Sequence, residues 1–412
     1  MLNNYLKLAI KVLMRRKFYT AINLFGIAFT LLVLCLAAAM MDNTLAPGPP
    51  ETRLDRILGI EYAKMSGPNG SWMSNPGYGL LDSYARDLPG AESFSITTTG
   101  NTVTSFVGGE KLESTLRRAD GEFWEIMEFD FVEGGPYTAA DEAAGNFVAV
   151  VNEATRERFL LGEPAVGKTI RADGQLFTVV GVVRDIAFTR RMSFADVWVP
   201  ISTAKSTAYR EKLLDRFQGI VLATSRRDFR TIKDEFDRRL GVAELPDPER
   251  FETLESGAYT QFEEASRSLS SDHNEPAPGR LALIIALSAA AFMLLPALNL
   301  VNLSLSRIME RSSEIGVRKA FGASSWTLVG QFLVENVVLT LVGGLLGFVL
   351  SVIVLRIVTG SALIPYAELQ VSMRVFLAGL GLSLVFAVIS GAYPAWRMSR
   401  LHPVEALRGR AR

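Results

Sequence analysis

Four uncharged apolar runs constrain this chain more than any other feature of its sequence. They cover residues 18–41, 281–305, 337–355 and 375–392, and none contains Lys, Arg, Asp or Glu. An α-helix rises about 1.5 Å per residue, so about 20 such residues cross the ~30 Å hydrocarbon core of a bilayer. The runs therefore predict an α-helical membrane protein with four transmembrane helices.

The first run also has some features of a cleaved signal peptide. A basic start precedes it, and the small residues Ala37, Ala38 and Ala39 stand near its end. Its apolar core is longer than the ~7–15 residues usual for a signal peptide, which favours an uncleaved anchor. Residues 1–17 before it carry an apolar stripe at helical spacing and are expected to form an amphipathic helix at the membrane surface.

A polar block, residues 42–280, separates the first two runs and contains no stretch long enough to cross a membrane. Its patterning is mixed, which predicts an α+β domain. Strands are expected at 57–65, 93–107, 111–118, 147–151, 169–172, 175–183, 197–199 and 219–223, and helices at 78–87, 152–161, 228–240 and 252–269. Asp173-Gly174 favours a type I′ hairpin between two of these strands.

Lys and Arg are unevenly distributed around the runs. They gather before the first run, between the second and third, and after the fourth: Lys7, Lys11, Arg15, Arg16 and Lys17; Arg307, Arg311, Arg318 and Lys319; Arg397, Arg400, Arg408, Arg410 and Arg412. The link between the third and fourth runs has only Arg356 and Arg374. The positive-inside rule therefore predicts that both termini are cytosolic and that 42–280 lies outside.

Composition excludes several classes of function. The formal net charge is +0, which argues against a nucleic-acid partner. The one cysteine, Cys35, cannot form an internal disulfide, and the isolated His273 and His402 offer no metal cluster or catalytic triad. We therefore expect no catalytic residues, no metal and no cofactor in this chain.

One stretch matches a nucleotide-binding pattern by letters alone. Residues 162–169 read G-E-P-A-V-G-K-T and fit G-x-x-x-x-G-K-[ST]. A phosphate loop needs a strand before it and a helix after it, so that backbone N–H groups converge on phosphate. Here a helix is expected before the loop and a hairpin after it, and Pro164 removes one N–H. We therefore interpret the match as accidental.

The third span has two further features. Gly343 and Gly347 form a G-x-x-x-G pair, which favours close helix packing. Glu335 lies in the amphipathic lead-in that begins at residue 326. It is either an intramembrane functional acid or, as we prefer, a marker of the membrane interface.

The charged segment between the second and third spans resembles a known family. Residues 299–324, "NLVNLSLSRIMERSSEIGVRKAFGAS", are similar to the coupling segment of the MacB/FtsX family of ABC transporter permeases, with Phe321 where Leu is usual. Residues 5–29, the stretch 150–185 and Pro403–Arg408 in the tail resemble the same family. The resemblance implies that an ATPase contacts Arg311, Glu314, Ile315, Gly316, Val317, Arg318, Lys319, Ala320 and Gly322.

The resemblance also implies partners and a role. We expect a permease subunit in a bacterial inner membrane that works with a cytosolic ABC ATPase, with a second permease copy or close paralogue, and with a periplasmic adaptor or membrane-fusion protein. Its role is expected to be mechanotransmission for export. An FtsX-like regulator of a periplasmic partner such as a cell-wall hydrolase, or a lipoprotein-releasing permease, is the alternative.

Together these arguments divide the chain. The expected parts are an interfacial helix 1–17, spans 18–41, 281–305, 326–355 (with its lead-in) and 375–394, an extracytoplasmic domain 42–280, a coupling segment 306–325, an external link 356–374 and a basic tail 395–412. By the resemblance, the extracytoplasmic domain consists of a porter-like part, 42–118 with 213–256, and an inserted smaller part, 119–212.

Overall fold

The computed structural model of the protein describes residues 11, 14, 15, 17–107, 110–270, 275–310, 325–361 and 364–399. The chain forms two compact units. The first comprises Met1–Asp42, Ala282–Ser361 and Leu369–Arg412, and the second comprises Asn43–Leu281 and Ala362–Glu368. We call them the helical unit and the α/β unit, and describe each by itself.

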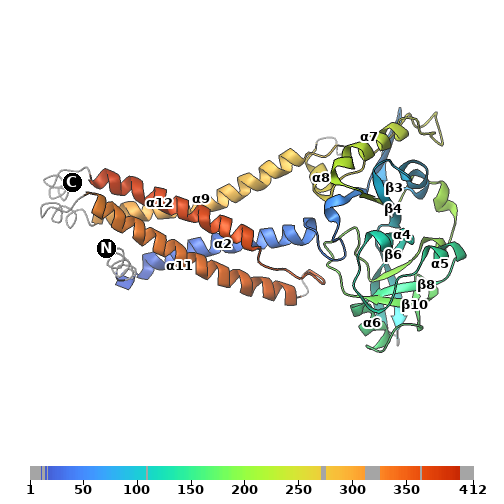
Figure 1. The fold of residues 1–412 in the computed structure, drawn as a ribbon, viewed down its shortest axis with the longest axis horizontal. Helices are drawn as coiled ribbons and strands as arrows, with labels where there is room; N and C mark the ends of the chain where they lie inside the picture. The colour runs from blue at the N-terminus through green and yellow to red at the C-terminus, as the bar shows by residue number, and fades with distance from the viewer. Residues whose placement is uncertain are drawn as a thin grey trace. The chain divides into compact units, whose positions relative to one another are not determined.

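The helical unit contains the four expected long helices, coloured blue, gold, orange and red along the chain in Figure 1. They are α2 (Lys17–Leu45), α9 (Pro278–Glu310), α11 (Ser325–Gly360) and α12 (Met373–Ser399). Among the described residues, three segments are long and apolar enough to cross a membrane: Lys17–Leu45, Leu333–Gly360 and Met373–Ser390. The described apolar part of α9, Pro278–Leu294, is shorter. The predicted membrane fold is confirmed.

Apolar packing holds three of these helices together. Ile27, Leu31 and Cys35 of α2 cluster with Leu339 of α11 and with α12 side chains. Other large apolar side chains of the same helices point outward, as expected for surfaces that meet lipid rather than water. The unit is therefore apolar both inside and outside.

The α/β unit is built on one ten-stranded mixed sheet. Its main path runs β1-β13-β4-β6-β11-β8-β10-β7, with β5 paired to β6 and β9 to β10. The strands along this path are β1 (Ile57–Ile60), β13 (Phe217–Ala223), β4 (Ala91–Thr98), β6 (Glu110–Ala119), β11 (Val197–Pro200), β8 (Val148–Asn152), β10 (Gln175–Val183) and β7 (Phe131–Gly134), with β5 (Asn101–Val107) and β9 (Thr169–Ala172) beside it. The β6–β11 and β8–β10 pairs are parallel, and the other pairs are antiparallel.

A second, smaller sheet has the order β12-β3-β2-β14. Its strands are β12 (Leu214–Asp215), β3 (Gly70–Pro76), β2 (Ala63–Gly67) and β14 (Thr253–Ser256). The helices of the unit are α3 (Tyr78–Leu80) with a π-turn (Leu81–Ala85), α4 (Glu122–Ile126), α5 (Ala139–Ala144), α6 (Glu153–Leu160), α7 (Phe229–Leu240) and α8 (Gln261–Ser266). The 3-10 turns are Leu54–Arg56, Ile201–Thr203, Ala208–Glu211, Arg226–Asp228 and Arg267–Leu269.

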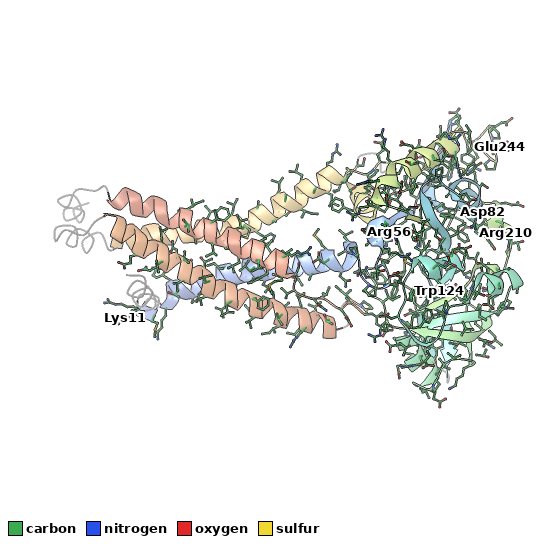
Figure 2. All side chains as sticks on the ribbon, in the orientation of Figure 1. Lys11, Arg56, Asp82, Trp124, Arg210 and Glu244 are labelled. Atoms are coloured by element: carbon green, nitrogen blue, oxygen red, sulfur yellow. The ribbon has the colours of Figure 1, made fainter. Side chains whose placement is uncertain are left out.

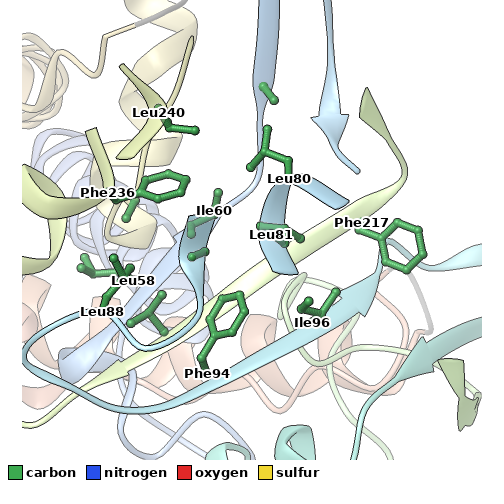
Figure 3. Packing of buried hydrophobic residues seen from close by; sticks show 14 of the residues in the cluster. Leu58, Ile60, Leu80, Leu81, Leu88, Phe94, Ile96, Phe217, Phe236 and Leu240 are labelled. Carbon is green, nitrogen blue, oxygen red and sulfur yellow. The ribbon is translucent and has the colours of Figure 1, made fainter. Parts of the chain in front are cut away.

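Buried side chains of the α/β unit form several clusters. One brings the two ends of the block together: Leu58, Leu81 and Phe94 from its start pack with Phe217 and Phe236 from its end (Figure 3). Another draws on residues from Leu116 to Val199, in the middle of the sequence. The division into porter-like and inserted parts stays a prediction, because the ten-stranded sheet runs continuously through both.

Several expected elements need correction. The expected strand 57–65 is two strands, β1 and β2, because each pairs in a different sheet. The range 93–107 is likewise β4 and β5, separated at Thr99 and Gly100. The expected helix 252–269 begins as the strand β14, which pairs with β2, and turns helical only at Gln261. The helix expected at 78–87 is only α3 and the π-turn.

Candidate functional site

The coupling segment itself lies outside the described residues. Every residue expected to contact an ATPase, from Arg311 to Gly322, falls in the stretch between the end of α9 at Glu310 and the start of α11 at Ser325. The two long helices on either side are described. The contacts of these helices are therefore the described part of the structure that lies next to the coupling segment in the sequence.

Helix α11 approaches α2 closely at its two spaced glycines. A Cβ built on Gly343 would lie 3.0 Å from Cβ of Ile27, and one on Gly347 would lie 3.1 Å from both Cα and the carbonyl oxygen of Ala28. Contacts this short are tighter than ordinary van der Waals contacts, so a side chain at either position would have to displace its neighbour on α2. The two glycines thus allow the α11 backbone to pack directly on α2, as small residues do in membrane helix pairs.

Glu335 lies inside the helical unit rather than on its surface. Its side chain is 1% exposed and accepts a hydrogen bond from Nε2 of Gln331 at 3.2 Å. The neighbouring Asn336 donates from Nδ2 to the carbonyl oxygen of Ala387 on α12 at 3.3 Å. The first of these bonds lies within α11, and the second joins α11 to α12 near the start of the apolar stretch of α11. The interpretation of Glu335 as a marker of the membrane interface stays a prediction, because burial among helices does not give its depth in a bilayer.

The link between α11 and α12 belongs to the α/β unit, which sequence reasoning missed. Residues Ala362–Glu368 cluster with that unit, while the helices on both sides belong to the other. The backbone N–H of Phe188 donates to the carbonyl oxygen of Pro365 at 3.1 Å, and the ring of Tyr366 lies 6.4 Å from that of Phe194. Ala367 is 2% exposed. The link is thus docked on the 187–194 loop.

That loop is anchored by buried charges. Glu51 is fully buried, accepts hydrogen bonds from Oγ of Ser193 at 2.8 Å and Nη1 of Arg190 at 3.2 Å, and forms an ion pair with Arg190. Burial raises the pKa of the Glu51 carboxyl, although Ser193 and Arg190 oppose the shift. A buried charge is tolerated only when it is paired and hydrogen-bonded. The loop therefore has a fixed conformation beneath the link.

Arg117 of β6 anchors the same loop from the sheet side. Its guanidinium donates to the carbonyl oxygens of Arg191 at 2.7 Å, Phe194 at 3.2 Å and Thr98 at 2.9 Å. Burial lowers the pKa of Arg117 to about 10. No sequence motif indicated this role, because a lone Arg in a strand reads as a surface residue.

The G-x-x-x-x-G-K-T stretch is not built to hold phosphate. It follows helix α6 and leads into β9, the reverse of the required order. Its Ala165 N–H donates to the Glu133 carboxylate at 2.9 Å, and its Gly167 N–H donates to the carbonyl oxygen of Val179 at 2.8 Å. Lys168 pairs with the carboxylate of Glu163. The N–H groups that phosphate requires are thus occupied, one of them by a negative charge.

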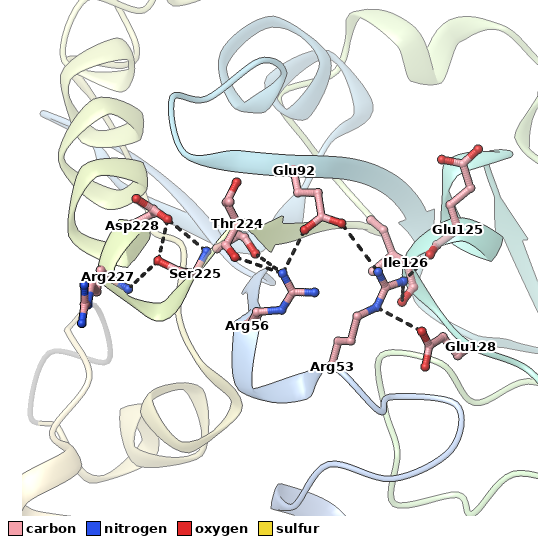
Figure 4. Close-up of polar contacts among 11 residues, drawn as sticks. Arg53, Arg56, Glu92, Glu125, Ile126, Glu128, Thr224, Ser225, Arg227 and Asp228 are labelled. Carbon is pink, nitrogen blue, oxygen red and sulfur yellow. Dashed lines mark hydrogen bonds and ion pairs between the residues drawn. The ribbon is translucent and has the colours of Figure 1, made fainter.

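The surface of the α/β unit carries a separate cluster of ion pairs, shown in Figure 4. Arg56 lies 2.9 Å from Glu92 and also donates to the carbonyl oxygen of Thr224 at 3.0 Å. Arg53 joins Glu92 at 3.8 Å and Glu128 at 3.5 Å. These charges are partly exposed and connect the segment after α2 to β4 and α4. We interpret these ion pairs as structural contacts and not as catalytic or binding groups.

Known proteins match both parts of the chain. Residues 20–239 match the model of the MacB-like periplasmic core domain, and residues 286–403 match that of the FtsX-like permease C-terminal region. The ABC transporter permease YknZ of Bacillus subtilis strain 168 is 24% identical over 326 residues, covering 78% of this chain and 77% of YknZ.

A longer relative and a solved structure are also similar to this chain. The pyoverdine export ATP-binding/permease protein PvdT of Pseudomonas fluorescens is 27% identical over 398 residues and covers 94% of this chain, which spans 57% of the length of PvdT. The crystal structure of the extracellular domain of YknZ aligns over 48% of this chain and 98% of that domain, with 17% identity and a TM-score of 0.37. The core-domain match alone covers more than half of the sequence, and this chain belongs to the MacB/FtsX family of ABC transporter permeases.

Proposed function

We propose that this chain is the permease subunit of an ATP-driven exporter, and that it passes movement from a separate cytosolic ATPase to its α/β unit. Family membership supports the permease role. The 314–324 motif in the loop between α9 and α11 supports contact with an ATPase. A second copy of the chain or a close paralogue completes the complex, and an extracytoplasmic adaptor receives the substrate.

The observation that carries the proposal is the number of places at which the chain passes between its two units. It crosses after Asp42, Leu281, Ser361 and Glu368, so all four helices are covalently connected to the α/β unit. Helix α2 continues to Leu45 and α9 begins at Pro278, so helical structure continues through both of these crossings. An α-helix is hydrogen-bonded internally along its length and transmits displacement as a stiff element.

The docked link adds the second helix pair to this path. Helices α11 and α12 flank the cytosolic motif and the basic tail at one end, and the 362–368 link at the other. Because Pro365 and Tyr366 contact the anchored 187–194 loop, displacement of α11 or α12 reaches the sheet through Arg117 and Glu51. We propose this as the route by which nucleotide-driven movement reaches the α/β unit.

The distribution of Lys and Arg supports the orientation in a bacterial inner membrane. We therefore propose that both termini and residues 306–325 lie in the cytosol and that the α/β unit lies outside. A reporter active only outside the cytosol should be active when fused after Ala223 and silent when fused after Ser313. The reverse pattern would overturn the orientation.

A regulator is the second candidate function, favoured by the FtsX-like match over residues 286–403. The same movement would then activate an extracytoplasmic partner such as a cell-wall hydrolase and export nothing. A lipoprotein-releasing permease is a further variant of the export function. ATP-dependent accumulation of substrate outside vesicles distinguishes export from regulation.

Glu314→Lys tests the coupling role. On an exposed helix the like-charge pair that it forms with Arg318 costs only a few tenths of a kcal/mol, about 0.2–0.5. At an interface the same reversal costs several kcal/mol, through like charges brought together. We expect normal membrane insertion, weaker co-purification of the ATPase and loss of transport.

The matched control is Glu244→Lys, a charge reversal at an exposed residue of the α/β unit. It should leave ATPase association unchanged. If Glu314→Lys retains full association and full output, the segment is only a solvated hairpin and the proposal is wrong.

A further inference from the structure

A cavity of about 330 Å³ lies in the α/β unit beside the 187–194 loop. Residues from six places in the sequence line it, among them Glu61 after β1, Thr115 and Arg117 of β6, Gln218 of β13, and Phe188, Arg191 and Phe194 of the loop. Its volume falls within the ~300–1,000 Å³ typical of small-molecule sites. Nothing in the membership of the family or in the coupling route accounts for it.

The loop that forms one wall is held in place by its neighbours, while two of its side chains stay exposed. Met192 is 1% exposed, and its carbonyl oxygen accepts a hydrogen bond from Nε2 of Gln218 at 3.2 Å. Arg190 and Ser193 turn inward to Glu51. Phe188 and Arg191 point outward between these anchors. A fixed backbone that presents two exposed side chains is a preorganised binding surface.

Two opposite charges line the cavity close enough to act on each other electrostatically, but no hydrogen bond or ion pair joins them. Among the described residues, the Arg191 guanidinium makes no hydrogen bond and no ion pair, although its own carbonyl oxygen is held by Arg117. In the same part of the chain the Glu61 carboxylate also has no hydrogen bond, although its backbone oxygen accepts from Nδ2 of Asn75 at 2.6 Å. Within the described residues, the cavity thus presents the Arg191 guanidinium and the Glu61 carboxylate without hydrogen bonds of their own, beside the Arg117 guanidinium, which is hydrogen-bonded to carbonyl oxygens.

An aromatic pair supplies the apolar wall. The rings of Phe188 and Phe194 meet edge to face with centroids 5.2 Å apart. Phe194 is 8% exposed and fixed, whereas Phe188 is 57% exposed. An exposed aromatic ring beside two unpaired charges can cover the apolar part of a bound molecule.

We propose that this cavity binds a small zwitterion of the amino-acid class with an apolar side chain. Glu61 receives its ammonium group, Arg191 receives its carboxylate, and Phe188 covers its side chain. Charge-assisted hydrogen bonds of this kind are roughly twice as strong as neutral ones. Because Phe188 also bonds to Pro365 of the link, the ligand contacts the route that joins the α/β unit to α11 and α12.

The role of this ligand as the exported substrate rests on the proposed function, but its binding does not. Binding is measured on the full-length permease in lipid nanodiscs without any ATPase. A failure there removes this site and leaves the coupling role intact. A failure of Glu314→Lys to uncouple removes the coupling role and leaves this site intact.

Protonation of Glu61 provides a further signature of the site. Burial raises the pKa of Glu61 to about 7; Glu264 and, more weakly, Glu51 act in the same direction, while Arg191 and Arg117 oppose them. An ammonium ligand requires the ionised carboxylate. Its affinity should therefore fall as the pH drops through about 7, and this dependence should vanish in Glu61→Gln.

The experiment compares four probes by saturation-transfer NMR: L-phenylalanine, phenylalanine amide, N-acetylphenylalanine and N-acetylphenylalanine amide. The parent chain should bind phenylalanine most tightly. Amidation and acetylation should each weaken binding about tenfold or more, because each removes one charge-assisted contact. The probe with neither charge should bind most weakly.

Two variants assign each charge to its residue. In Arg191→Gln, phenylalanine and its amide should bind equally, while N-acetylation still weakens binding. In Glu61→Gln, phenylalanine and N-acetylphenylalanine should bind equally, while amidation still weakens binding. Glu244→Gln, an exposed acid labelled in Figure 2, is the control and should retain the full pattern.

Three outcomes overturn the proposal. One is that none of the probes binds the parent chain. Another is that N-acetylphenylalanine binds as tightly as phenylalanine, which makes the cavity a site for anions only. The third is that neither Arg191→Gln nor Glu61→Gln changes the order of the four probes.

Discussion

The two units of this protein bury polar groups in opposite ways. In the helical unit, glycines let the α11 backbone approach α2, and the buried polar side chains among the described residues are amides, hydroxyls and the acid Glu335. In the α/β unit, whole charges are buried, with Glu51, Arg190 and Arg117 anchoring one loop. The difference follows from the solvent. Helices in lipid satisfy their own backbone and gain from close packing, whereas a loop on a sheet needs side chains to satisfy its carbonyl groups.

The largest expected effect is loss of the buried pair in the α/β unit. Glu51→Ala leaves the Arg190 guanidinium buried without a counter-charge and removes the acceptor of Ser193. Breaking such a pair from one side costs about 3–5 kcal/mol. We expect a large drop in the unfolding midpoint of the full-length protein. The fluorescence of the buried Trp124 and Trp198 measures this midpoint.

A second variant tests the cause of this loss. Glu51→Ala combined with Arg190→Met removes both charges and should recover much of the stability. If the double variant is as unstable as Glu51→Ala, the unpaired charge is not the reason, and the contrast between the two units loses its main support.

A smaller effect is expected where α11 packs on α2. Gly347→Val places a branched side chain against Ala28 and Leu31, where even a Cβ would lie 3.1 Å away. Overpacking of this kind costs about 1–3 kcal/mol. The thermal midpoint in detergent should fall, and ATP-dependent output should fall with it.

Gly381→Val is the matched control, because a Cβ on Gly381 of α12 meets nothing within 4 Å. Both variants add the same side chain to an apolar helix. Equal effects of the two would show that the helix, rather than the α2–α11 contact, is what the substitution disturbs.

The exposed ion pairs of Figure 4 should contribute less to stability than the buried Glu51–Arg190 pair or the packing of α11 on α2. Glu92→Ala removes the carboxylate shared by Arg53 and Arg56, whose side chains are 24% and 28% exposed. Partly exposed pairs are worth about 0–1 kcal/mol and weaken with salt. The midpoint should change slightly at low salt and not at high salt. A loss comparable to that of Glu51→Ala would erase the distinction between buried and exposed pairs.

The smallest effect is expected at the sequence that imitates a phosphate loop. Lys168→Ala removes only the exposed contact with Glu163. ATP hydrolysis by the assembled complex should be unchanged. Loss of hydrolysis in a complex of normal composition would mean that the loop binds nucleotide after all.

Local chemistry was enough to predict some elements. Strands β9 and β10 have the expected bounds, because Asp173 and Gly174 both take the positive φ that a type I′ turn requires. The long helices of the helical unit were predicted from the four uncharged apolar runs. Strand β14 was missed, because Thr253–Ser256 becomes a strand only by pairing with β2, far away in the sequence.

The part of the candidate site predicted from sequence, the coupling segment, lies outside the described residues and stays a prediction. Glu51, Arg117 and Arg190 read as ordinary surface charges, since nothing nearby in the sequence predicts their burial. The docking of Pro365 and Tyr366 on the 187–194 loop was likewise hidden, because it depends on contacts across more than 170 residues of sequence. Long-range packing decides such sites, and a sequence pattern does not contain it.

The most direct test of the central claim is the distance between spin labels on the α/β units of two copies in the ATPase complex. Val242→Cys suits the label because Val242 is 74% exposed, while the native Cys35 is buried. Trapping the ATPase with ATP should shift the distance distribution, and Glu314→Lys should abolish the shift. An unchanged distribution in a complex that hydrolyses ATP would contradict transmission from the ATPase to the α/β unit.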